Sequence, residues 1–175
     1  MKYLHFYKNY LIEGKRDNKH PSNPNNDEHY KALKKTGFWG RQGAGCLVLS
    51  RETKRILIPH RSPYVLQPST WGVWGGAIDS EEIPINSVKR ELEEEAGYSG
   101  SVKFITLSVY QQDNFKYHNF LAIVESEFIP QMNWETDGYL WTSIDELPKP
   151  LHFGLEWLLE KDGLKIRDII KNLYL

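Results

Sequence analysis

The stretch RELEEEAG, from Arg90 to Gly97, constrains this chain most strongly, because four of its eight residues are glutamate. Pro84, shortly before it, suits the first turn of a helix, and Gly97 is placed to end a helix in a left-handed cap. Apolar residues recur between these two signals at spacings of three and four, namely Ile85, Val88, Leu92 and Ala96. The sequence therefore predicts an amphipathic helix over residues 85–96.

Three of the glutamates, Glu91, Glu94 and Glu95, fall on one arc of this helix beside its apolar stripe, while Glu93 points elsewhere. Like charges at these spacings cost a helix about 0.2–0.5 kcal/mol per pair, which exposed side chains tolerate. One interpretation is therefore a solvated acidic face. The other is that hard divalent cations cancel the repulsion, because carboxylate oxygens suit Mg²⁺ or Mn²⁺. The surrounding residues decide between the two.

The helix belongs to a longer pattern with fixed spacing. Five residues separate Gly76 from Glu82, and seven separate Glu82 from the triplet Arg90-Glu91-Leu92. Single residues then precede Glu94-Glu95 and Gly97. This pattern resembles the signature of the Nudix hydrolase family, and the resemblance extends more loosely over about residues 41–160.

Tyr98 departs from the family pattern, since members usually carry an aliphatic residue there. An aromatic ring should fit a half-buried position without touching the metal chemistry. The resemblance implies an α/β fold, a Nudix-type α/β/α sandwich with a mixed β-sheet flanked by helices. It assigns residues 41–175 to a Nudix hydrolase domain that includes the C-terminal helices, and leaves residues 1–40 as an N-terminal appendage.

Hydrophobic patterning predicts the elements outside the motif. Apolar and alternating runs predict strands over residues 43–50, 55–60, 103–110, 117–126 and 139–142. The passage over residues 62–82 is rich in Gly and Trp and is expected to be loop with brief extended pieces. Two C-terminal helices are expected, over residues 151–161 and 162–175, separated at Asp162-Gly163.

The resemblance also implies an activity. We expect a metal-dependent hydrolase that cleaves the pyrophosphate bond of a nucleoside diphosphate linked to another group and releases a nucleoside monophosphate. Its cofactor would be Mg²⁺ or Mn²⁺, because a divalent ion neutralises charge on the pyrophosphate and lowers the pKa of a bound water. The expected metal contacts are Glu91, Glu94 and Glu95 on the helix, with Glu82 and the Gly76 backbone as further contacts.

The catalytic residues expected from the motif are Glu91, Glu94 and Arg90. Glu91 is the first choice for the base that accepts the proton of the water, and Glu94 or an acid in a later loop, such as Glu135 or Asp137, are alternatives. Arg90 would bind and orient a neighbouring carboxylate with its planar fork. Three further residues are candidates for substrate binding: Arg61 near the phosphates, Glu135, and Trp71.

The tryptophan assignment has competitors, since several aromatic residues suit either base stacking or core packing. These are Trp39, Tyr64, Trp71, Trp74 and Phe153. The substrate itself stays open among a nucleotide sugar, a nucleoside triphosphate and a dinucleotide. A different class is a catalytically weak Nudix domain that senses nucleotides or binds proteins. The motif acids Glu82, Glu91, Glu94 and Glu95 are all present, which favours an enzyme.

Composition narrows the partners and the compartment. Lys and Arg number 22 against 23 Asp and Glu, so the formal net charge is -1 and no whole-chain basic field draws the protein to nucleic acid. We therefore expect a small nucleotide as the partner rather than nucleic acid or a membrane, with a second copy of the chain as a further candidate. The single cysteine, Cys46, lies in an apolar run and fits a buried thiol in a cytoplasmic protein.

Overall fold

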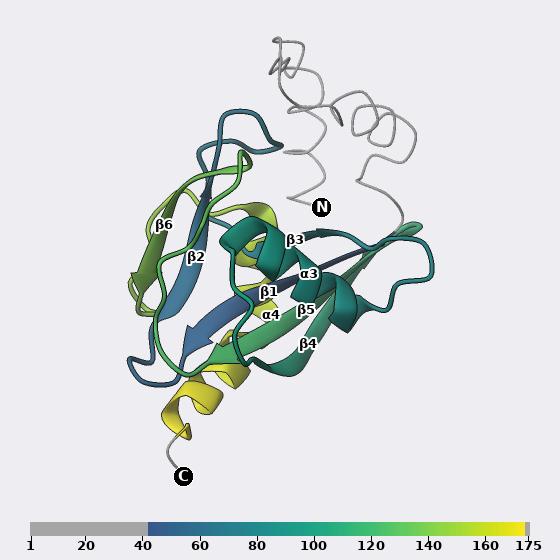
Figure 1. Cartoon of the computed structure of the whole chain (residues 1–175). Helices are drawn as coiled ribbons and strands as arrows, with labels where there is room; N and C mark the ends of the chain where they lie inside the picture. The colour runs from purple at the N-terminus through teal and green to yellow at the C-terminus, as the bar shows by residue number, and fades with distance from the viewer. Residues whose placement is uncertain (1–41, 174–175) are drawn as a thin grey trace.

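The computed structural model describes residues 42–173, and the predicted N-terminal appendage lies outside the described residues. A mixed six-stranded sheet stands between helix α3 on one face and helix α4 on the other (Figure 1). The elements in chain order are β1 Gln42–Ser50, β2 Ile56–Arg61, β3 Trp74–Ala77, α3 Pro84–Ala96, β4 Lys103–Gln112, β5 Phe115–Val124, β6 Thr136–Thr142 and α4 Phe153–Lys171. The α/β sandwich expected from the resemblance is confirmed.

The sheet has the order β4-β5-β1-β2-β6, and β3 pairs with β1 outside this path. Strands β1 and β5 run parallel, whereas the other pairs are antiparallel. The first half of β1 pairs with β3 over Gly43–Cys46, and its second half pairs with β2 at Val48 and Leu49. β3 and β2 therefore pair with successive halves of β1. The edge of β3 that does not pair with β1 contacts α3.

Alternate residues of β1 serve two hydrophobic clusters, one on each face of the sheet. Cys46 and Val48 pack with residues of α3, while Leu47 and Leu49 pack with residues of α4. The Cys46 thiol is fully buried, and burial raises its pKa, so it is an inert core group. The sheet is thus covered on both sides, which explains the nearly continuous apolar run of this strand.

The predicted motif helix is confirmed as α3, with both of its local signals in place. Pro84 stands at the start, and Gly97 caps the end in the left-handed region with φ 66. Val88, Leu92 and Ala96 of the predicted stripe are buried against the sheet, whereas Ile85, in the first turn, is exposed. Tyr98 is half-buried, and its ring centroid lies 4.4 Å from that of Phe128.

The predicted break at Asp162-Gly163 is wrong, because α4 is one helix from Phe153 to Lys171. The buried Asp162 carboxylate accepts a hydrogen bond from the Ser108 N–H at 2.7 Å. Ser108 lies where the register between β4 and β5 shifts, so its N–H needs an acceptor from elsewhere. The Asp162 side chain thus has its hydrogen-bond partner on β4, far away in the sequence, although Asp162-Gly163 is locally typical of a helix end.

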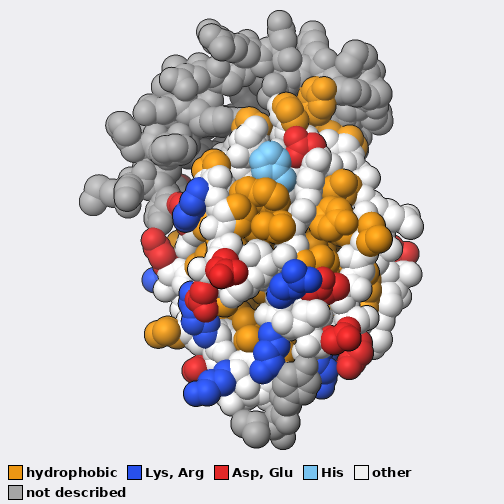
Figure 2. Space-filling view, turned by 90° about the vertical axis from the view of Figure 1, so that its left-hand side faces the viewer, with side chains coloured by type: hydrophobic (Ala, Val, Ile, Leu, Met, Phe, Trp, Pro, Cys, Tyr) orange, Lys and Arg blue, Asp and Glu red, His pale blue; other side chains and the backbone are white. Residues whose placement is uncertain are grey.

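The surface over β2 and β6 carries positive, negative and hydrophobic side chains interspersed with one another (Figure 2). Neither of the two described helices, α3 and α4, is both long enough and apolar enough to cross a membrane.

Candidate active site

A cavity of about 460 Å³ lies where α3, β3, β5, the loop before β6 and the start of α4 meet. One part of its wall is acidic and includes Glu91, Glu94, Glu95 and Glu135. Another part is aromatic and includes Tyr110, Phe115, Tyr117, Phe153 and Trp157. The cavity therefore joins a region suited to charge with a region suited to a flat ring.

Side chains of α3 hold the helix against the free edge of β3. Glu95 accepts a hydrogen bond from the Gly75 N–H at 2.8 Å, and Arg90 donates from Nη2 to the Ala77 carbonyl at 3.1 Å. Residues 75 and 77 are two apart, so their outward backbone groups share one edge of the strand. These bonds set the rotation of α3 and, with it, the direction of the glutamates.

Arg90 is the hub of the charged cluster. Its guanidinium donates to both carboxylate oxygens of Glu82, at 3.2 and 3.0 Å. It also donates to Glu91 at 2.9 Å and to Glu94 at 3.1 Å. A planar fork is suited to bridging several carboxylates in this way. Arg90 thus orients the acids and keeps them together despite their repulsion.

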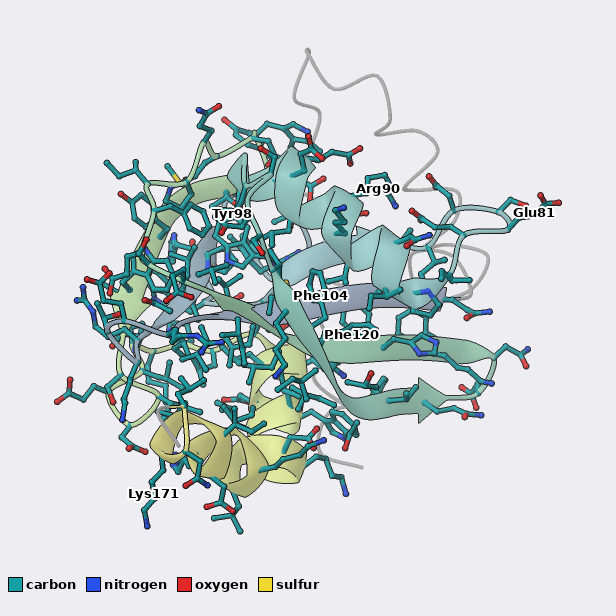
Figure 3. All side chains as sticks on the ribbon, turned by 60° about the horizontal axis from the view of Figure 1, so that its bottom comes forward. Glu81, Arg90, Tyr98, Phe104, Phe120 and Lys171 are labelled. Carbon is teal, nitrogen blue, oxygen red and sulfur yellow. The ribbon has the colours of Figure 1, made fainter. Side chains whose placement is uncertain are left out.

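Glu82 and its neighbour Glu81 differ sharply in position. The Arg90 hydrogen bonds hold the pKa of Glu82 below its usual range, and its carboxyl group also accepts from the Asp79 N–H at 3.2 Å. Glu81 has φ 68 and extends into solvent from the loop before α3, away from Arg90 (Figure 3). The loop therefore turns the second glutamate of the pair toward the helix.

The pKa of Glu91 is set by its burial and by the charges of its neighbours. Burial raises its pKa to about 7, although the positive charge and hydrogen bond of Arg90 act in the opposite direction. Negative charge on Glu94 and Glu135 raises the pKa further. A carboxyl group with this pKa changes protonation state near neutral pH.

Glu95 and Glu135 bring two carboxyl groups together from different parts of the chain. Burial raises the pKa of both, and each lies within hydrogen-bonding reach of the other. The Glu135 charge raises the pKa of Glu95 further, whereas Arg61 lowers that of Glu135. Each of the two carboxyl groups therefore keeps its proton to a higher pH than an exposed glutamate does, because burial disfavours the charged form. Buried, mutually repelling carboxylates are also the donor set that Mg²⁺ or Mn²⁺ prefers, so these residues fit such an ion.

The fit is one of chemistry rather than of a finished coordination shell. Within residues 42–173, no three His, Cys, Asp or Glu side chains stand together in an arrangement ready to hold a metal. Several of the acid oxygens are engaged by Arg90 and Gly75 instead. The metal contacts expected at Glu82, Glu91, Glu94, Glu95 and Gly76 therefore stay predictions.

The structure separates the remaining candidates. Arg61 lines the cavity and donates from Nε to the Leu66 carbonyl at 2.9 Å, which holds its side chain in place. Glu135 lines the cavity, whereas Asp137 pairs with His60 at 2.5 Å. Trp71 is not among the lining residues; its ring packs on His60 with centroids 4.8 Å apart. Trp71 therefore lies apart from the residues that line this cavity, and its role in substrate binding stays a prediction.

Sequence reasoning missed most of the aromatic wall. The ring centroid of Tyr110 lies 5.2 Å from that of Trp157 and 6.1 Å from that of Phe153. Tyr110 pairs across the hairpin with Tyr117, whose pKa is raised by burial first and then by Glu95, so its phenol stays protonated. The alternation of side chains along β4 and β5 indicates which strand residues share a face. Their contact with the rings of α4 cannot be predicted from the sequence.

Comparison with known proteins gives consistent results. A model of the NUDIX domain family matches residues 40–161. The chain is 44% identical over 136 residues to a Mycobacterium tuberculosis protein named "Putative 8-oxo-dGTP diphosphatase 3", with 69% of this chain and 62% of that protein covered. It therefore spans less than two thirds of the length of this relative.

Solved structures agree on the fold. A MutT Nudix hydrolase from Burkholderia pseudomallei is 25% identical, with a TM-score of 0.57 over 69% of this chain and 96% of that one. A Nudix hydrolase from M. smegmatis is 24% identical, with a TM-score of 0.60 over 79% of this chain and 91% of that one.

Proposed function

The chain belongs to the Nudix hydrolase family, and from this premise we propose that it cleaves the pyrophosphate bond of a nucleotide with the help of Mg²⁺ or Mn²⁺. Its substrate is a nucleoside diphosphate linked to another group, and nucleoside triphosphates are the first candidates. The observation that carries the proposal is the cavity in which the acids of α3 and Glu135 share one space with an aromatic wall. The name of the mycobacterial relative supports a triphosphate with an oxidised base.

The acidic wall is suited to a divalent cation, which the phosphates of a nucleotide also bind. Glu91, Glu94 and Glu95 would hold the ion from α3, with Glu82 and the Gly76 backbone as further contacts. When bound, a divalent ion offsets the charge of the pyrophosphate and makes the attacking water more acidic. Arg61, which lines the same cavity, places a positive charge beside the phosphates.

Proton transfer falls to a carboxylate beside the ion. Glu91 is our first assignment, because its carboxyl group lines the cavity and Arg90 orients it with a hydrogen bond of 2.9 Å. Glu135 is the second candidate, since it lines the cavity and lies next to Glu95. The nucleobase stacks within the aromatic wall, which fixes the distance between the base and the reacting phosphorus.

The test is turnover of a nucleotide panel with Mg²⁺ or Mn²⁺, scored by release of nucleoside monophosphate. The panel contains dGTP, 8-oxo-dGTP, a nucleotide sugar and a dinucleoside polyphosphate. Glu94→Gln should abolish turnover while the thermal midpoint is retained. Glu93→Gln is the matched control, because Glu93 is exposed on the same helix and lines no part of the cavity. Tight binding of one nucleotide by a parent protein that cleaves none would favour the alternative, a nucleotide sensor.

A further inference from the structure

Asn119 presents an unused hydrogen-bond acceptor to the cavity. It lies on β5, is 3% exposed, and lines the cavity beside the aromatic wall. Its Nδ2 donates to the Ser108 carbonyl at 2.9 Å and to the Tyr117 carbonyl at 3.5 Å. These carbonyls accept only, so they determine which end of the amide is nitrogen. The carbonyl end, Oδ1, faces the other way.

The amide is held in this orientation by the irregularity of β4. Between Thr106 and Val109 the register of β4 with β5 shifts. The backbone groups of Ser108 therefore form hydrogen bonds with side chains. Asp162 accepts from the Ser108 N–H at 2.7 Å, and Asn119 donates to the Ser108 carbonyl. A flipped amide would set oxygen against this carbonyl and lose the bond. The bulge therefore commits Asn119 to presenting an acceptor.

Within residues 42–173, no donor meets Asn119 Oδ1. Oδ1 is also not one of the described side-chain atoms that are both sealed from solvent and without a hydrogen bond. Because Asn119 lines the cavity, a ligand that fills the cavity can approach its side chain although the residue is buried. A buried polar side chain with a free acceptor at a ligand-sized cavity is suited to a donor carried by the ligand.

Two other cavity residues have the opposite polarity. Gln67 accepts from the Phe153 N–H through Oε1 at 3.2 Å, which leaves its NH₂ group as a donor. His152 accepts from the Gly154 N–H through Nδ1 at 3.1 Å, so its proton is on Nε2. Burial lowers the pKa of His152, which keeps the ring neutral. Gln67 and His152 thus each carry N–H groups that these two bonds do not use.

We propose that Asn119 selects the nucleobase by accepting, through Oδ1, a hydrogen bond from an N–H group on the edge of the base. This inference rests on the proposed function and adds the class of base. Bases with an N–H at position 7 or an amine at position 2 are preferred over bases that lack this donor. An 8-oxopurine, for example, has an N–H at position 7, where guanine has an acceptor nitrogen. A site that requires a hydrogen bond discriminates strongly against an analogue that lacks it.

The test pairs each donor-bearing nucleotide with an analogue that lacks the donor. The pairs are 8-oxo-dGTP with dGTP, for the N–H at position 7, and dGTP with dITP, for the 2-amine. The parent should prefer the donor-bearing member of at least one pair by about tenfold or more in kcat/KM. Asn119→Leu should remove that preference by slowing the donor-bearing substrate, while the rate on the other member changes little. A purely structural loss would lower both members equally.

Asp162→Ala is the matched control, because it removes the other side-chain bond to the Ser108 backbone and does not line the cavity. It should retain more of the parent's preference than Asn119→Leu does, because Asn119 Nδ2 keeps its bond to the Ser108 carbonyl. Discrimination that persists in Asn119→Leu, or that disappears equally in Asp162→Ala, overturns the proposal. Equal kcat/KM within both pairs for the parent overturns it without any variant. If Asn119→Leu does not fold, Asn119→Ala takes its place.

The proposed function can fail separately. A parent protein that cleaves none of these nucleotides would refute the proposed function. The same two pairs would then be compared by dissociation constants from titration calorimetry, where the preference and its loss in Asn119→Leu still test the role of Asn119.

Discussion

The Glu91 carboxylate rests against the backbone of Gly76, so that a Cβ at Gly76 would stand 2.7 Å from Glu91 Oε1 and 2.9 Å from Oε2. The absent side chain is what lets the carboxylate occupy this place. Gly76 lies on β3 and Glu91 on α3, so the contact joins two parts of one sequence motif across the edge of the sheet.

Gly76→Ala should displace the Glu91 carboxylate and lower kcat/KM by about 10- to 100-fold, because small misplacements of a reacting group are costly. Stability should change little, since the atoms in conflict are the mobile end of a side chain. The measurement is turnover together with the thermal midpoint. Gly72→Ala is the control, because the nearest atom to its Cβ is Arg61 Cδ at 3.6 Å, an ordinary contact. Parent-like turnover of Gly76→Ala would show that the place of Glu91 is unimportant.

Arg90 and Glu82 should be energetically coupled. Arg90→Lys loses the fork that reaches both Glu82 oxygens, and Glu82→Gln removes the charge that the fork binds. Because both changes break the same interaction, their effects on the free energy of unfolding should fall short of additivity by about 0.5–3 kcal/mol in a double-mutant cycle. Glu81→Gln, beside Glu82 but exposed, should couple with neither. Full additivity would show that the contact contributes nothing.

The metal-free protein should lose stability as the pH rises from about 5 to 8. Burial raises the pKa of Glu91 from 4.5 to about 7, so folding favours the protonated carboxyl. The unfolded chain releases this proton first, and the contribution of Glu91, roughly 3 kcal/mol at most, is lost as the pH passes through the folded pKa. Glu95 and Glu135 have raised pKa values and act in the same direction.

Glu91→Gln should flatten this pH dependence and make the metal-free protein more stable than the parent at pH 8. The measurement is urea unfolding in the presence of a chelator at several pH values. Glu93→Gln, whose side chain is exposed, should keep the parent's slope. A parent whose stability rises between pH 5 and 8 would contradict the expectation.

Two glycines should respond to alanine with opposite signs. Gly163 lies inside α4, and its Cβ would meet the flexible end of Arg167 at 3.0 Å. Gly163→Ala should therefore stabilise the fold by about 0.5–1 kcal/mol, because glycine is a poor helix former. Gly97 has φ 66, and its Cβ would stand 2.7 Å from Gln131 Cβ, so Gly97→Ala should destabilise the fold. Thermal and urea unfolding measure both changes.

Local signals were reliable wherever their cause lies within a few residues. Helix α3 begins at Pro84 and ends before Gly97 because ring geometry and a left-handed cap act on the immediate backbone. The same reasoning failed at Asp162-Gly163, since the acceptor role of Asp162 depends on Ser108, 54 residues away. The local signal for a helix end was thus outweighed by a hydrogen bond between residues too far apart in the sequence for local patterns to reveal.

The sequence by itself determined the family, the α/β class and the helix that presents the glutamates, because periodicity and motif spacing are properties of neighbouring residues. Only the tertiary structure decided that Glu135 lines the cavity while Asp137 pairs with His60. It also decided that Phe153 lines the cavity while Trp71 does not, and that the Asn119 amide donates to the Ser108 carbonyl. These outcomes depend on which distant segments meet and which backbone groups are left to satisfy, and folding alone settles both.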